Sequence, residues 1–115
     1  MTTVFSDTQR RHTQWTPQEI QNFFSRARRV YQGPFFDIRL AHQTYPNWGH
    51  LLIVTPRKMG NAPQRNLFKR RVKAIFHEQQ LSLCGFDIGI FGKPGAAAVP
   101  FAELCAILTS VCTKK

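Results

Sequence analysis

The residues that could do chemistry in this chain are concentrated in one basic interval without acidic residues. No Asp or Glu occurs between Asp37 and Glu78, whereas this interval holds Arg39, Arg57, Lys58, Arg65, Lys69, Arg70, Arg71 and Lys73. A solvated helix usually carries charges of both signs, because like charges on neighbouring turns destabilise it. An uncompensated basic cluster is typical of a protein that binds a polyanion. Nucleic acid is the first candidate, and an anionic membrane surface is the second.

Many of these cations recur at helical spacing after Pro63. Arg65, Lys69 and Lys73 follow one another at intervals of four, and Asn66 and Arg70 occupy the adjacent row. Arginine contacts phosphate with two hydrogen bonds, lysine with a point charge, and asparagine as donor or acceptor. The opposite flank is apolar, with Phe68, Val72, Ile75 and Phe76. The pattern predicts a helix docked on phosphates, with a merely solvated amphipathic helix as the alternative.

The sequence contains no pattern typical of acid–base, nucleophilic or metal-ion catalysis. The six acidic residues are scattered and form no closely spaced set, and Ser and His show no triad spacing. The three cysteines form no CxxC pair and the four histidines no HxH or HxxxH pair. We therefore expect no catalytic residue in this chain and no metal or cofactor bound by the protein alone. Cys84, Cys105 and Cys112 are interpreted as reduced core residues.

Three helices and three or four strands are needed to position the basic segment. Thr16 and Glu19 form a capping box for a helix over 17–27. Alternation predicts a strand over 35–41, and Leu51–Val54, apolar on both faces, is expected to be central in the sheet. A helix starts at Asn61 or Ala62 and extends to about Leu83. A strand follows over 86–91. Pro100 opens a last helix whose apolar face is Phe101, Leu104, Cys105, Leu108, Val111 and Cys112.

Composition limits the chain to one compact domain. Its 115 residues carry a net charge of +10, and 43% of them are apolar, which is enough to build a core. No run approaches the roughly 20 apolar residues of a membrane span, and the first residues lack a secretion signal. We expect a cytoplasmic α+β domain over 16–113 that binds RNA, without a membrane partner. Residues 1–15 are expected to be a mobile arm.

The segment from Arg57 to Lys73, RKMGNAPQRNLFKRRVK, resembles the diagnostic box of the bacterial ribonuclease P protein component. That family shows a basic pair, a Gly, an Ala, then Arg-Asn, two residues, Lys-Arg and a further basic residue. The resemblance implies one four-stranded sheet with three helices in the order αβββαβα, including a left-handed βαβ crossover. The fourth strand would lie around 29–32. It also implies a protein subunit that supports 5′ maturation of precursor tRNA by a catalytic RNA, whose phosphates hold Mg²⁺.

The same resemblance assigns roles to individual residues. Arg57, Lys58, Arg65, Asn66, Lys69, Arg70 and Lys73 match the positions that contact the ribonuclease P RNA. The cleft for the precursor tRNA leader would be formed by Ile20 and Phe24 of the first helix, with Phe36 or Ile38 supplying the sheet surface. Ile20 stands where the family often has Phe, and the usual basic run of the N-terminal arm is reduced to Arg10 and Arg11.

Two other classes remain open at this point. A ribosomal or RNA-chaperone module would share the basic helix but support no reaction. The segment 85–91 faintly resembles the aromatic strand of an RNA-recognition motif, although it lacks the leading basic residue and carries Asp87. A DNA-binding module comes third, because no helix-turn-helix pattern precedes the basic helix.

Overall fold

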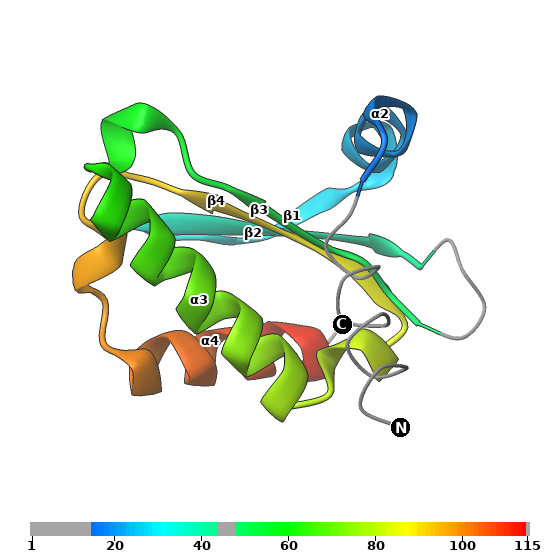
Figure 1. Cartoon of the computed structure of the whole chain (residues 1–115). Helices are drawn as coiled ribbons and strands as arrows, with labels where there is room; N and C mark the ends of the chain where they lie inside the picture. The colour runs from blue at the N-terminus through cyan, green and yellow to red at the C-terminus, as the bar shows by residue number, and fades with distance from the viewer. Residues whose placement is uncertain (1–14, 44–47, 115) are drawn as a thin grey trace, which may run out of the picture.

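The computed structural model describes residues 15–43 and 48–114 of the chain. Within these residues, three α-helices pack against one four-stranded sheet (Figure 1). The elements in chain order are α2 (Pro17–Arg26), β1 (Arg28–Gln32), β2 (Phe36–His42), β3 (Leu51–Val54), α3 (Ala62–Glu78), β4 (Phe86–Gly92) and α4 (Phe101–Lys114). Short 3₁₀ turns η1 (Arg57–Met59), η2 (Leu81–Leu83) and η3 (Ala96–Ala98) connect them. The predicted α+β class, the order αβββαβα and the short strand near 29–32 are confirmed.

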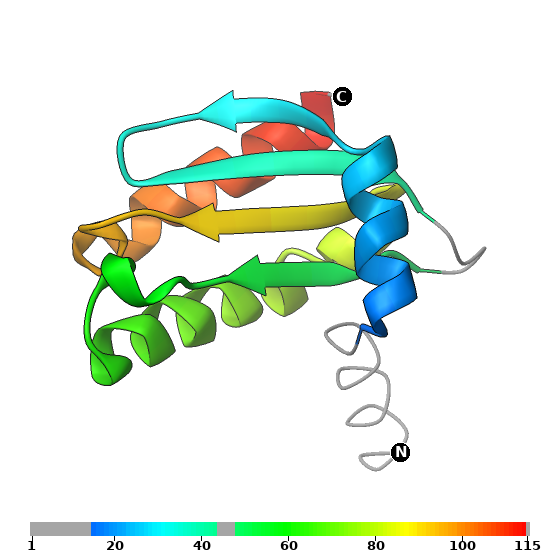
Figure 2. The same cartoon turned by 90° about the horizontal axis from the view of Figure 1, so that it is seen from above.

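The sheet separates the helices into two layers. Its strand order is β1-β2-β4-β3, with β3 parallel to β4 and the other two pairs antiparallel. Helices α3 and α4 cover one face, and α2 alone crosses the opposite face near one end of the strands (Figures 1 and 2). The β3–α3–β4 connection passes beneath the sheet in the left-handed sense (Figure 2), against the right-handed sense of roughly 98% of such crossovers.

The hydrophobic core lies between the sheet and the α3–α4 layer. The apolar flank predicted for the basic helix is buried there: Phe68, Val72, Ile75 and Phe76 of α3 are all inaccessible or nearly so. Ile38, Ile88 and Ile90 meet them from β2 and β4. From α4, Leu104, Leu108 and Cys112 complete the layer, whereas Phe101, predicted in the same face, remains 38% exposed at the first turn of the helix.

Two capping boxes fix where α2 and α3 begin. The Thr16 hydroxyl accepts the Glu19 amide, and the Glu19 carboxylate accepts the Thr16 amide. Asn61 and Gln64 repeat the same reciprocal pair at α3, so Asn61 is the cap. Both helices carry Pro in the first turn, where its missing N–H has no intrahelical partner to lose. These local signals explain why both starts could be predicted.

Two predictions are wrong, one about where a helix ends and one about where a strand lies in the sheet. Helix α3 ends at Glu78 rather than near Leu83, because Gln80 adopts a left-handed backbone conformation with φ 52° and Leu81 starts the separate turn η2. Strand β3 lies at an edge of the sheet, not at its centre. Its apolar residues are covered without a second neighbouring strand, since α3 packs beneath it and the Trp15 indole N–H donates to the Leu51 carbonyl at 2.8 Å.

Candidate nucleic-acid interface

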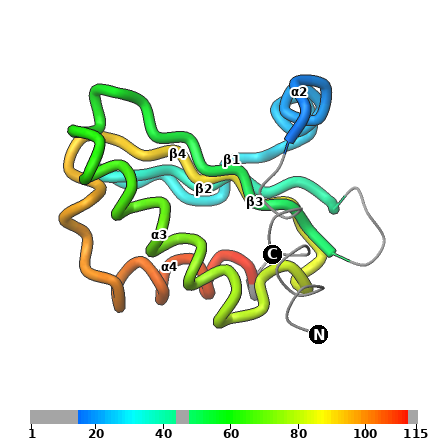
Figure 3. Tube along the Cα trace, in the orientation of Figure 1, coloured from blue at the N-terminus to red at the C-terminus, as the bar shows by residue number. Residues whose placement is uncertain are grey.

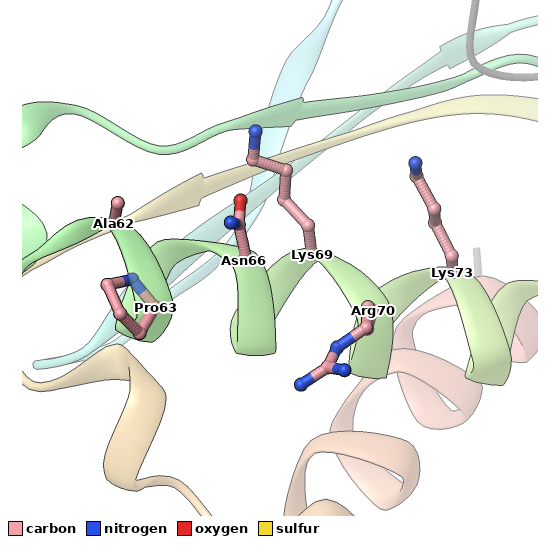
Figure 4. A pocket seen from close by; sticks show the side chains of 6 residues that line it. All are labelled: Ala62, Pro63, Asn66, Lys69, Arg70 and Lys73. Atoms are coloured by element: carbon pink, nitrogen blue, oxygen red, sulfur yellow. The ribbon is translucent and has the colours of Figure 1, made fainter.

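The outer face of α3 presents the predicted basic residues side by side. Asn66, Arg70 and Lys73 are exposed, and Lys69 is half-buried. A shallow groove along this face is lined by Ala62, Pro63, Asn66, Lys69, Arg70 and Lys73, and we call it the α3 groove. Figure 4 shows Asn66, Lys69 and Lys73 extending from one side of the helix and Arg70 from the adjacent side. The structure thus brings together four of the seven residues predicted to bind RNA.

The basic pair before the helix extends the same surface. Arg57 and Lys58 are exposed on η1, the turn that leads from β3 toward α3 (Figure 3). Met59 of the same turn is buried in the core, so η1 is anchored while its two cations face outward. Arg65 joins the turn to the helix, because its Nε donates to the Gly60 carbonyl at 3.2 Å. Part of the role of Arg65 is therefore structural.

No acidic side chain neutralises this surface within the described residues. The ion pairs there join Arg26 to Asp87 and Lys93 to Asp37, and none involves a cation of α3 or η1. Arg71, also part of the basic run, faces inward: its Nη1 donates to the carbonyls of Ala97 at 3.1 Å and Val99 at 2.8 Å. Arg71 thus fastens η3 to α3, whereas its neighbour Arg70 remains available for a ligand.

Two adjacent phenylalanines of α2 have different environments. Phe23 is fully buried on the sheet, and a Cβ added at Gly89 would lie 2.7 Å from Cε2 of Phe23, so glycine is required under this ring. Phe24 is 44% exposed, with its ring centroid 5.6 Å from that of Phe91 on β4. Ile20 is half-buried on the same helix. The Phe24 ring is therefore not part of the core and is available to a ligand.

The sheet residues predicted beside Phe24 are wrong. Phe36 and Ile38 are 2% and 0% exposed and point into the core beneath the sheet, on the face opposite α2. Alternation along β2 separated the two faces correctly but could not say which one faces α2. The residues on the α2 side include Phe91 and Arg39, and the guanidinium carbon of Arg39 lies 5.5 Å from the Phe91 ring centroid. We call Phe24, Phe91 and Arg39 the α2–sheet surface.

A buried carboxylate secures the end of α2. Asp87 is fully buried; it accepts the His50 amide at 2.8 Å and lies 3.5 Å from Nη2 of Arg26. Arg26 also donates to the His42 carbonyl at 2.7 Å. Burial, partly offset by Asp87, lowers the pKa of His50 below its usual 6.5, so this imidazole is neutral at neutral pH. Asp87 is therefore a structural acid, not part of a catalytic pair.

Neither a metal centre nor a membrane span is present in the part of the chain that the structure describes. No group of three or more His, Cys, Asp or Glu side chains there could hold a metal ion. No helix among those residues is long and apolar enough to cross a membrane. Residues 1–14 of the predicted mobile arm, including Arg10 and Arg11, lie outside the described residues.

Comparison with known proteins decides the family. The sequence model of the Ribonuclease P family matches residues 9–115. The chain belongs to the ribonuclease P protein family. A curated relative, the ribonuclease P protein component of Mycoplasma pneumoniae, is 31% identical over 84 residues, which cover 70% of this chain and 71% of the relative. The family resemblance read from the basic box is confirmed.

Solved structures agree on the fold of this ribonuclease P protein. The RNase P protein from Thermotoga maritima superimposes with a TM-score of 0.73 at 22% identity, covering 90% of this chain and 96% of that one. The Staphylococcus aureus RNase P protein gives a TM-score of 0.73 at 19% identity, covering 87% and 91%. The sheet and its three helices are thus the arrangement of this family. As a ribonuclease P protein component, the chain is part of an enzyme that has an RNA partner.

Proposed function

We propose that this protein binds the catalytic RNA of ribonuclease P and the 5′ leader of precursor tRNA, and so supports endonucleolytic 5′ maturation of tRNA. The observation that carries the proposal is the uncompensated basic surface of η1 and α3. Arg57, Lys58, Arg65, Asn66, Lys69, Arg70 and Lys73 would contact phosphates of the RNA subunit. Such contacts release counterions from the RNA, which makes binding strong at low salt.

The leader would bind on the opposite side of the sheet. Phe24 and Phe91 offer aromatic faces on which unpaired bases can stack, and Arg39 lies beside them to meet a phosphate. Ile20 would extend this surface with an apolar contact only. The two RNA-binding surfaces are thus separated by the sheet, so one protein can hold the RNA subunit and the leader at the same time.

The chemistry of cleavage would belong to the RNA subunit. Among the described residues, no group of three or more His, Cys, Asp or Glu side chains could hold Mg²⁺. The Mg²⁺ ions would then be held by RNA phosphates, and this chain would contribute binding, orientation and charge neutralisation. We infer that the protein acts in the cytoplasm.

The RNA that accompanies the protein in cells tests this proposal against the ribosomal or chaperone alternative. We expect the tagged protein to co-purify with one dominant species, the ribonuclease P RNA, identified by sequencing. The matched control is the Arg70→Ala, Lys73→Ala variant, which should recover much less of it at the same salt concentration. Recovery of ribosomal RNA as the dominant species would overturn the proposal in favour of the alternative.

A further inference from the structure

We propose that this protein carries a third RNA contact, a site for one unpaired nucleotide at the corner where α2 ends and β1 begins (Figure 2). A hollow of about 520 Å³ is lined there by Arg26, Arg28, Val30, Leu40, Ala41, His42 and Phe86, and we call it the corner hollow. Its volume lies within the usual range of small-ligand sites. The inference rests on the proposed function, because its ligand is a nucleotide of single-stranded RNA.

The corner hollow is separate from both surfaces described above. It shares no lining residue with the α3 groove or with the α2–sheet surface. His42 pairs with Phe86 and Leu40 with Ile88, in the same alternation as the core residue Ile38. The side chains of Leu40, His42 and Phe86 therefore point to the sheet face opposite Phe24 and Phe91. Ala41 and the Asp87-bound Arg26 line the hollow from the α2 side, so the hollow lies at the end of the sheet between its two faces. A nucleotide stacked on His42 there would leave Phe24 and Phe91 uncovered.

The hollow offers both an aromatic stack and an apolar floor. The rings of His42 and Phe86 are stacked, with centroids 5.6 Å apart and an interplanar angle of 25°. His42 is exposed, so a base can extend this stack from the solvent side. Beside it, Val30 of β1 is 40% exposed and offers an apolar surface. A base is a flat, largely apolar ligand that would cover both.

Two arginines at the rim favour an anionic ligand. The Arg28 side chain is exposed, and it makes no ion pair or hydrogen bond with any residue in the described part of the chain. Arg26 is held in place by its bonds to the His42 carbonyl and to buried Asp87. Arg26 compensates the charge of Asp87, which leaves the charge of Arg28 for a phosphate. Aromatic stacking combined with a free guanidinium is the chemistry that recognises a nucleotide.

Binding of uridine 5′-monophosphate and adenosine 5′-monophosphate to the isolated protein, followed by NMR, tests the site directly. We expect shifts of the Val30 methyl and His42 ring signals. Arg28→Ala should weaken binding at least about tenfold, the factor expected for a lost charge-assisted hydrogen bond. Arg29→Ala is the matched control, because Arg29 is an exposed neighbour of equal charge that does not line the hollow. Equal losses in both variants, or no shift at Val30 and His42, would overturn the proposal.

Photocrosslinking in the assembled complex distinguishes the source of the nucleotide. The RNA subunit and the precursor tRNA leader are substituted with 4-thiouridine in separate experiments, and crosslinked peptides are identified by mass spectrometry. Crosslinks to His42 or Phe86 from either RNA support the site and identify its ligand. Their absence with both RNAs contradicts it. If the parent protein did not change the rate at which the RNA subunit cleaves precursor tRNA, the proposed function would be refuted. Mononucleotide binding to the isolated protein would still test the corner hollow independently.

Discussion

At the scale of single residues, neighbouring side chains of the same type differ in exposure. One is buried or bonded within the fold, and the other is exposed and available to a ligand. Phe23 and Phe24 are one such pair, and Arg70 and Arg71 are another. Helical spacing alone does not distinguish Phe23 from Phe24 on α2. Only the position of Gly89 beneath Phe23 separates them, and that contact joins residues distant in the sequence.

Phe24→Ala should affect the leader and not the fold. We expect the affinity for leader-bearing precursor tRNA, relative to mature tRNA, to fall by roughly 1–3 kcal/mol, because one stacking face is lost. Affinity for the RNA subunit and the melting temperature should stay near the parent values, since the ring is 44% exposed. Phe23→Ala is the control and should cost about 3–5 kcal/mol of stability. Equal losses on both substrates would remove Phe24 from the site.

Cys84 should be the reactive thiol of the chain. The hydrogen bond from the Cys112 thiol lowers the pKa of Cys84 to about 7, whereas that bond and burial raise the pKa of Cys112. Alkylation of Cys84 by iodoacetamide, followed by mass spectrometry, should therefore reach half its maximal rate near neutral pH. In Cys112→Ala the midpoint should rise toward the ordinary value of about 8.5. The same midpoint in both proteins would show that Cys112 does not control this thiol.

At the scale of elements, α3 joins two functions on one helix. Its inner flank of Phe68, Val72, Ile75 and Phe76 contributes to the core, and its outer flank carries the α3 groove. This division could be predicted because helical periodicity is a local property, as is the Asn61–Gln64 cap. The end of α3 and the edge position of β3 could not be predicted, because they depend on the backbone of Gln80 and on contacts with distant Trp15.

Arg70→Ala and Arg71→Ala should separate the two flanks of α3. We expect Arg70→Ala to change stability by less than about 0.5 kcal/mol and to flatten the slope of log affinity for the RNA subunit against log salt by about 0.7–0.9. Arg71→Ala removes the donor to two carbonyls of the η3 region and should cost roughly 1–3 kcal/mol of stability with little change in that slope. Thermal melting and filter binding at several salt concentrations measure both effects. Reversed results would mean that Arg71, not Arg70, contacts RNA.

At the scale of the whole molecule, the sheet separates the two surfaces that we propose to bind RNA. Helix α3, which carries the α3 groove, lies beneath the sheet, and α2, which carries Phe24, lies above it (Figure 1). The left-handed crossover places α3 on the layer with α4 and leaves the opposite face to α2 alone. Composition and alternation could predict one sheet with helices, but not this handedness, which came from the family resemblance. Phe36 and Ile38 were wrongly predicted to lie beside Phe24 for the same reason. Alternation along a strand separates two sets of side chains, but it does not say which set faces α2.

Cleavage of leader-bearing precursor tRNA by the cognate RNA subunit at low magnesium concentration tests the central claim most directly. RNA-free protein alone should leave the substrate uncut, and adding parent protein to the RNA subunit should accelerate 5′ maturation. Arg70→Ala combined with Lys73→Ala, at an unchanged melting temperature, should require a higher protein concentration for the same acceleration. Cleavage by rigorously RNA-free protein, or no acceleration by the parent protein, would contradict the account.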